Sequence, residues 1–369
     1  MLVTASPTLM IQDTTSLVAG VNPYLGIDTE FVPLFNGSPL FPHLLNLDQD
    51  RVAKTHSGWK NHVVDWHGDG YAFELCTEPV KEISTLLQNV STGFRLLGRR
   101  IYKTYNQTWT PRDKVLLWAP PIYSIPEEIV ANAPERVQLL GCAPSFNVYP
   151  GDFANPKVLA SNERSTGTHL HISHPFLTTS DVVKLVKWAD VMVGAVWTYI
   201  SPENPEEESR RRQAYGRAGE HRFNIYPIPP GNIPSRAFED ATEWCGVEYR
   251  VLPGRVAANP VYLSLMLILY REALRETLIS NSEPTTSLSE LAREAINKAD
   301  KTIAAEVLRK LRISDQDVRL LNYYSRYSQE FMYSGQWYRA GQRNEGVIKN
   351  YMMYGVHAND FELTQKEAD

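Results

Sequence analysis

Four short segments of the sequence carry ionisable side chains at alternate positions: GIDTEF (26–31), YAFEL (71–75), GTHLHIS (167–173) and GVEYRVL (246–252). Successive side chains of a β-strand point to opposite faces, so residues two apart share a face. Each segment therefore predicts a strand with one apolar and one polar face. The polar faces would carry Asp28, Glu30, Glu74, His169, His171, Ser173, Glu248 and Arg250.

For any one segment, the ordinary alternative is an antiparallel strand whose polar side faces water. Solvated faces usually mix lysine, threonine and serine with acids, whereas these faces carry four carboxylates, two histidines and no lysine. If the strands are neighbours, two carboxylates ~4 Å apart repel by on the order of 4 kcal/mol at an effective dielectric constant of 20. Two divalent cations would balance the four carboxylates. Oxygen-rich ligands with one or two imidazoles suit Mg²⁺ or Mn²⁺ better than zinc.

Metal ions held in this way are typical of phosphoryl transfer, where they bridge the phosphate oxygens of ATP. The phosphates also need cationic side chains, and guanidinium groups suit their oxygens. We expect Arg250 to contact phosphate, because it shares a strand face with Glu248. Further arginines in 201–236 could bind nucleotide or could form a solvated patch that pairs with the acidic run 206–208. The candidate contacts are Arg164, Ser173, Arg210, Arg211, Arg212, Arg217 and Arg222.

The neighbouring sequence predicts the elements that would position these side chains. Strands at 59–66 and 71–76 flank the tetrapeptide HGDG (67–70), whose Asp-Gly dipeptide supplies the positive φ of a tight hairpin. Apolar residues recur at helical spacing over 80–102, which predicts a helix that covers a sheet. A second helix is expected to begin near Ser180, where side-chain hydroxyls can cap its first turn.

Further along, six prolines and alternating charge clusters between 201 and 236 predict a long functional loop. Asn259 and Pro260 predict a helix start, because asparagine caps the first turn and proline suits the first helical position. That helix should run to about residue 279. The pattern SLSE at 287–290 has the form of a capping box and is expected to open another helical stretch.

These elements predict an α+β catalytic domain over residues 1–285. Its mainly antiparallel, curved sheet would have a polar concave face as the active site and an apolar face packed on helices. Residues 286–369 are expected to form a mostly helical C-terminal extension. Its tyrosines could be packing surface or an oligomer interface, and they are Tyr323, Tyr324, Tyr327, Tyr333 and Tyr338.

The overall composition excludes several classes of function. The chain has 369 residues, 43% of them hydrophobic, and a net charge of -5, so it has no field that would attract nucleic acid or an anionic membrane. The apolar stretch 182–200 contains Lys184, Lys187 and Asp190, which predicts a buried helix rather than a membrane span. No basic segment typical of a secretory signal precedes the mildly apolar N-terminal stretch.

The three cysteines have neither C-x-x-C pairing nor metal-type spacing, so the sequence indicates no disulfide framework and no zinc site. Reduced thiols fit a cytoplasmic protein.

The ordered motifs resemble those of the glutamine-synthetase superfamily. Within it the chain looks most like the carboxylate-amine ligases of the second type, which are often encoded by bacteriophages. The matches run from residue 26 to about 265, about two-thirds of the 369 residues, and leave the C-terminal extension unexplained. Two departures are Asp28, where glutamate is usual, and Thr168, where glycine is common. The motifs are G-x-E-x-E-F-like (26–31), D-G-x-x-x-E (69–74), G-x-H-x-H-x-S (167–173), R-R-x-x-Y-G-x-A-G-x-x-R (211–222) and E-x-R with A-N-P (248–260).

This resemblance implies a glutamine-synthetase-like fold and an ATP- and Mg²⁺-dependent ligase in the cytoplasm of a bacterial or phage-infected cell. The enzyme would convert a carboxylate into an acyl phosphate, and an amine would then displace phosphate to form an amide. Arg250 would face the transferred phosphate, and Arg211, Arg212 and Arg222 would serve nucleotide or substrate. His171 could position the nucleotide or the substrate, or it could have a structural role. The implied metal ligands are Asp28, Glu30, Glu74, His169 and Glu248.

Two other functions remain open from the sequence. The same groups would serve a phosphotransferase that acts on a carboxylate or guanidino group, or the chain could be a non-enzymatic phage protein that retains the fold. No counterpart is found for the loop glutamate that accepts the ammonium proton in glutamine synthetase, which argues against ammonia as the amine. The carboxylate and amine could be small molecules or peptides.

Overall fold

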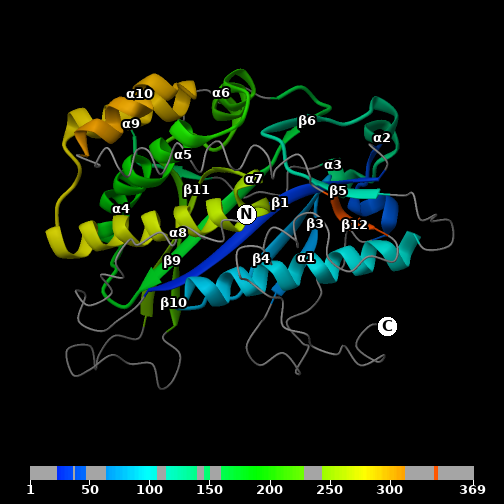
Figure 1. Cartoon of the computed structure of the whole chain (residues 1–369), viewed down its shortest axis with the longest axis horizontal. Helices are drawn as coiled ribbons and strands as arrows, with labels where there is room; N and C mark the ends of the chain where they lie inside the picture. Colours follow the sequence, from blue (N-terminus) through cyan, green and yellow to red (C-terminus); the bar gives the residue numbers. More distant parts are fainter. Residues whose placement is uncertain are drawn as a thin grey trace, which may run out of the picture.

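The computed structural model is an antiparallel sheet covered by helices, which confirms the predicted α+β class (Figure 1). Every strand pairing among the described residues is antiparallel. The structure describes residues 23–35, 38–46, 64–105, 114–138, 145–149, 159–227, 243–311 and 336–339.

The strands are β1 (Tyr24–Phe35), β2 (Ser38–Pro39), β3 (Val64–Asp69), β4 (Ala72–Thr77), β5 (Lys114–Trp118), β6 (Ile122–Ser124), β7 (Phe146–Asn147), β8 (Glu163–Ser165), β9 (Gly167–His174), β10 (Glu220–Pro227), β11 (Glu243–Pro253) and β12 (Gln336–Arg339). The main sheet has the order β12-β5-β1-β9-β11-β10-β7. The β3–β4 hairpin also joins β1, and β6 pairs separately with β8. All four strands expected to carry polar faces are therefore adjacent, in the order β4-β1-β9-β11.

The helices are α1 (Ile83–Tyr105), α2 (Glu127–Asn132), α3 (Glu135–Gln138), α4 (Val182–Ala189), α5 (Ala195–Ile200), α6 (Pro205–Ala214), α7 (Arg255–Ala258), α8 (Pro260–Arg275), α9 (Thr286–Lys298) and α10 (Lys301–Lys310). Helices α1 and α8 cover one face of the sheet, and α9 and α10 pack against α5 and α6 at one end (Figure 1). Short 3-10 segments lie at Pro42–Leu45 and Thr179–Asp181, and π-helical turns lie at Asp190–Gly194 and Glu276–Ser280.

The apolar face of the sheet packs on α1 and α8. The ring of Phe31 on β1 lies 5.3 Å from that of Phe94 on α1, and the ring of Tyr249 on β11 lies 5.8 Å from that of Tyr270 on α8. Burial of each large apolar side chain contributes roughly 1.5–3 kcal/mol. Because one face of the sheet packs in this core and side chains alternate between the two faces of each strand, the polar residues lie on the opposite face.

A pair of threonines interrupts the apolar face. Thr29 on β1 and Thr168 on β9 lie opposite each other, and their hydroxyl oxygens are 2.9 Å apart. Thr168 also donates to the carbonyl of Gly254, so its buried hydroxyl is satisfied. The departure from glycine at position 168 is therefore accommodated within the core, away from the polar face.

The hairpin prediction is confirmed, with β3 and β4 joined at Gly70, whose φ is +58°. Of its expected first strand, residues 59–63 lie outside the described residues. The helix predicted over 80–102 begins at Ile83, and the helix expected near Ser180 begins at Val182, where the backbone N–H of Thr178 donates to Asp181. The apolar stretch 182–200 forms α4, a π-helical turn and α5, buried along most of its length.

The prediction of a long loop over 201–236 was wrong. Pro205 occupies the first helical position of α6, behind Asn204, whose side chain accepts a hydrogen bond from Glu206 N–H. Proline suits this position, because the N–H that it lacks would have no partner within the helix. Pro227 ends β10 rather than preventing it. Residues 228–242 lie outside the described part of the chain.

In the C-terminal part, α9 is capped by Thr285, which accepts from Leu288 N–H, rather than by the predicted box at 287–290. Tyr338 lies in β12, which pairs with β5, so the expected extension contains a strand as well as helices. The other four tyrosines lie outside the described residues, and the division at residue 285 stays a prediction. No helix in the described ranges is long and apolar enough to cross a bilayer.

The start of α8 gives a test of local stability. Asn259 is buried, and its side chain accepts from Val261 N–H at 2.9 Å. Asn259→Ala should lower the free energy of unfolding by about 1 kcal/mol, measured by urea denaturation, because the first turn loses its cap. Asn259→Gly should cost only on the order of 0.3 kcal/mol, since glycine is tolerated at this position. Equal losses in the two variants would contradict capping as the cause.

Candidate active site

Strand register aligns the polar side chains in rows across the sheet. Asp28 on β1 lies opposite Cys76 on β4 and His169 on β9, and Glu30 lies opposite Glu74. Further across, Glu248 on β11 lies opposite both His171 on β9 and Arg222 on β10. The structure thus gathers all five predicted metal ligands, together with His171 and Arg222, on one face of the sheet, and Arg250 lies buried beside Glu248.

Two histidines on this face have different protonation states. His171 Nε2 lies 2.9 Å from an Asp28 carboxylate oxygen. Burial opposes a charge on His171, but the Asp28 carboxylate outweighs it and raises the pKa of His171 to about 9. At neutral pH His171 is therefore a cation. Burial and the nearby Arg250 hold the pKa of His169 well below its usual value, which leaves a neutral imidazole suited to metal ligation.

Three of the predicted ligands converge closely. Asp28, Glu74 and His169 each offer one ligand atom, and these atoms all lie within 4.8 Å of one another. Burial and the adjacent Glu74 raise the pKa of Glu30 to about 8, although its Oε2 accepts a hydrogen bond from Gly167 N–H at 2.8 Å. Converging carboxylate oxygens and a neutral imidazole are suitable ligands for a divalent cation. The individual ligand roles stay predictions.

Arg250 is fully buried beneath the polar face. Its Nη1 lies 2.5 Å from a Glu248 carboxylate oxygen, and its Nη2 donates to the hydroxyl of Tyr215. The same hydroxyl lies 2.6 Å from His169 Nε2, and His169 Nδ1 lies 3.3 Å from Glu248. Arg250 therefore positions Glu248 in this arrangement, and its predicted contact with phosphate stays untested. Arg222 is more accessible, with 24% of its side chain exposed, and lies 3.9 Å from Glu248.

Arg211 and Arg212 have positions that favour a structural role over the predicted nucleotide contact. Both are buried in the last turn of α6. Arg211 donates to the carbonyls of Thr166, Val251 and Leu252 at 2.9–3.0 Å. Arg212 donates to the carbonyls of Val251 and Gly216 and pairs with Glu208 at 3.2 Å. Together they hold the irregular turn of β11, where its register with β9 shifts between Tyr249 and Leu252.

Gly216 is required by this packing. Its φ is +70°, and a Cβ atom at this position would lie 2.6–2.9 Å from the guanidinium of Arg211. The glycine therefore provides both the left-handed backbone and the space for the buried arginine.

The remaining candidate cations also have protein partners. Arg164 donates to the carbonyls of Ser161 and Glu163 and lies over the ring of Tyr71 at 5.2 Å. Arg210 pairs with Glu163 at 2.7 Å, and Arg217 donates to the carbonyls of Arg212 and Gln213. Ser173 lies opposite Tyr24 and Gly246, farther along β9 than His169 and His171. The contacts of Arg164 do not support its predicted role as a nucleotide ligand. Ser173 remains a candidate nucleotide ligand, because it lies on the polar face of the sheet.

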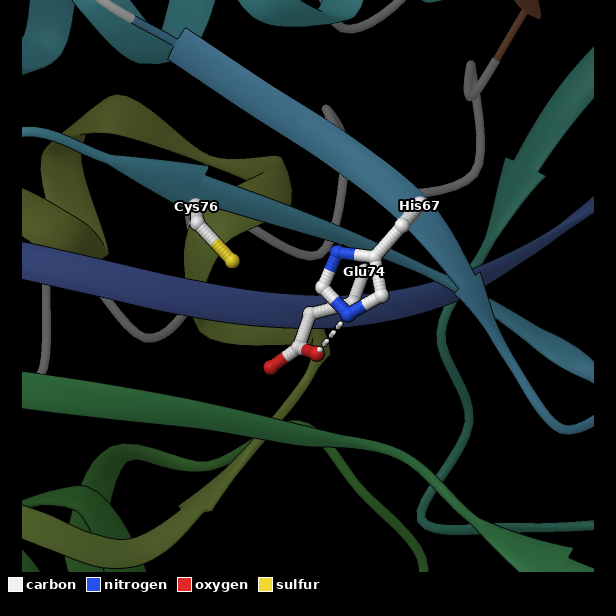
Figure 2. Close-up of side chains that lie close together, drawn as sticks. All are labelled: His67, Glu74 and Cys76. Carbon is white, nitrogen blue, oxygen red and sulfur yellow. Dashed lines mark ion pairs between the residues drawn. The ribbon is translucent and has the colours of Figure 1, made fainter. Parts of the chain in front are cut away.

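Sequence reasoning missed three residues of this face. Tyr215 was noted only within a motif, although its hydroxyl contacts both His169 and Arg250. His67 and Cys76 were overlooked, and they lie beside Glu74 (Figure 2). Cys76 is two residues from Glu74 on β4, so strand alternation could have identified it.

The sequence matches no protein-family model and no curated protein significantly. Three solved structures are similar to the chain at low TM-scores. The first, a novel glutamine synthase homolog, has a TM-score of 0.35 and 12% identity, with 90% of this chain and 71% of that chain covered. The second is the complex of the prokaryotic ubiquitin-like protein Pup and its ligase PafA. It has a TM-score of 0.34 and 11% identity, with 94% of this chain and 72% of that chain covered.

The third is a bifunctional glutathione synthetase from Pasteurella multocida. It has a TM-score of 0.26 and 12% identity, with 86% of this chain and 53% of that chain covered. At TM-scores below 0.5, these similarities indicate nothing about the chemistry of this site.

The structural role of Arg211 can be tested through stability. Arg211→Ala would remove the guanidinium that donates to three backbone carbonyls, of which that of Val251 keeps a donor from Arg212. The free energy of unfolding should therefore fall by on the order of 3 kcal/mol or more in urea denaturation. Arg210→Ala is the matched control, because the neighbouring arginine has 52% of its side chain exposed and should lose much less stability. Similar losses for the two variants would contradict the structural assignment.

Proposed function

We propose that the protein is an ATP- and Mg²⁺-dependent carboxylate-amine ligase. The observation that carries this proposal is the convergence of Asp28, Glu74 and His169 on a face that also holds Glu30 and the Glu248–Arg250 pair. The proposed catalytic unit is residues 1–285. The order of motifs in the sequence supports the same chemistry, including the type of ligase often encoded by phages.

The candidate magnesium ligands fit the ion by their chemistry. Asp28 and Glu74 offer carboxylate oxygens, His169 offers a neutral imidazole, and Glu30 and Glu248 lie nearby on adjacent strands. Mg²⁺ prefers oxygen ligands and is commonly bound by a few carboxylates together with substrate phosphates. When bound, it would offset the negative charge on the phosphate oxygens of ATP.

Two cations are placed to meet an anionic group on this face. His171 is protonated at neutral pH, and about a quarter of its side chain is exposed. Arg222 lies one strand beyond Glu248 and has a similar exposure. We assign both to orient the phosphates or the substrate carboxylate. Arg250 and Tyr215 act behind them, because their contacts fix Glu248 and His169.

The proposed reaction has two balanced steps. A carboxylate oxygen of the first substrate attacks the γ-phosphorus of ATP, and the bond to ADP breaks to give an acyl phosphate and ADP. The nitrogen of an amine then attacks the acyl carbon, and inorganic phosphate leaves with its bonding electron pair. The amine nitrogen loses a proton, and an amide is formed. The substrates are a small-molecule or peptide carboxylate and amine.

Binding of Mg-ATP is the first test. The wild-type protein should bind ATP in calorimetry only when Mg²⁺ is present. Asp28→Asn should weaken Mg-dependent binding by at least about tenfold, since even an outer-sphere partner of a metal costs about 10–100-fold when removed. Glu290→Gln is the control, because Glu290 pairs with Arg293 on the surface of α9, away from the sheet. Wild-type protein that does not bind Mg-ATP would contradict the proposal.

The products then identify the reaction. Incubation with ATP, Mg²⁺ and a panel of carboxylates and amines should yield ADP, phosphate and an amide, detected by mass spectrometry. A stable phosphorylated product without an amide would instead identify a phosphotransferase.

A further inference from the structure

A second group of metal-binding side chains lies on the same face of the sheet. His67 on β3 and Glu74 and Cys76 on β4 each offer one ligand atom, and these atoms all lie within 4.8 Å of one another. Figure 2 shows the three side chains on the two strands of the β3–β4 hairpin. His67 Nε2 lies 2.9 Å from a Glu74 carboxylate oxygen. None of the assigned functions uses His67 or Cys76.

Strand geometry, rather than spacing in the sequence, brings these ligands together. His67 and Glu74 lie directly opposite each other in the hairpin, and Cys76 is two residues from Glu74 on the same face. The sequence has no zinc-type cysteine spacing, because the group is assembled across two strands. All three residues are partly exposed, so a dissolved ion can reach them.

We propose that His67, Glu74 and Cys76 bind a divalent transition metal of the zinc class. One imidazole nitrogen, one carboxylate oxygen and one thiolate form a mixed ligand set that suits Zn²⁺, Co²⁺ or Fe²⁺, whereas Mg²⁺ takes oxygen ligands. Three protein ligands leave a coordination position for water or substrate. On binding, a metal–sulfur bond forms and the thiol proton is released to solvent.

This position adjoins the proposed magnesium site. Glu74 belongs to both groups of ligands, with Asp28 and His169 on one side and with His67 and Cys76 on the other. A carboxylate has two oxygens and can contact two cations. The structure therefore provides two neighbouring metal positions of different chemical preference. The mixed-ligand position is argued from its own ligands and does not depend on ATP binding.

Cobalt is a direct probe of this site, because Co²⁺ takes zinc positions and a cobalt–thiolate bond gives a near-ultraviolet charge-transfer band. Full-length protein, freed of metal by a chelator and titrated with Co²⁺ alone, should develop this band. Cys76→Ser should abolish it, and His67→Ala should weaken cobalt binding by about tenfold or more. Cys245→Ser is the matched control and should retain the band, because Cys245 is a buried thiol on the apolar side of β11.

Wild-type protein also provides a test without any substitution. Zn²⁺ should bleach the cobalt band, and excess Mg²⁺ should leave it in place. Absence of the band, its persistence in folded Cys76→Ser protein, or its loss at Mg²⁺ concentrations as low as the Zn²⁺ concentrations that bleach it would overturn the proposal. Parallel Mg-ATP titrations separate the two ideas. If the protein binds ATP but gives no cobalt band, only the proposed mixed-ligand metal site is ruled out. If it gives the band but does not bind ATP, only the proposed ligase function is ruled out.

Discussion

Repulsion among carboxylates on adjacent strands is the constraint on which the polar face depends. The protein offsets part of it with its own cations, because His171 pairs with Asp28, and Arg250 pairs with Glu248. Glu30 retains a pKa near 8, so its environment disfavours the carboxylate form. Carboxylates held close together in this way would be stabilised further by a bound cation, which is consistent with the metal site that we propose.

The opposite face makes this arrangement possible. The apolar layer against α1 and α8 fixes each strand in one register, since a shift by one residue would turn the charged residues into the core. Where β11 departs from regular pairing, Arg211 and Arg212 satisfy its carbonyls from the end of α6. Arg250 lies within this irregular turn, so the two arginines stabilise the backbone that positions it.

The sequence predicted the strands and their polar faces well, because alternation is a local property. It could not predict which residues oppose one another, since register depends on packing between distant segments. His67 and Cys76 were missed for this reason. The burial of Arg211 and Arg212 was not predicted, because a charged residue on a short helix carries no local sign of burial. The loop predicted over 201–236 was wrong because proline breaks a helix only in its interior, and Pro205 begins one.

A single carboxylate, Glu74, links the two groups of metal ligands. If both positions bind ions, the two binding events share a coupling free energy, and each ion must change the affinity of the other by the same factor. The sign of this coupling free energy depends on two opposing terms for the second ion, its attraction to the shared Glu74 oxygens and its repulsion from the first ion. Binding of one metal would then shift the concentration at which the other binds.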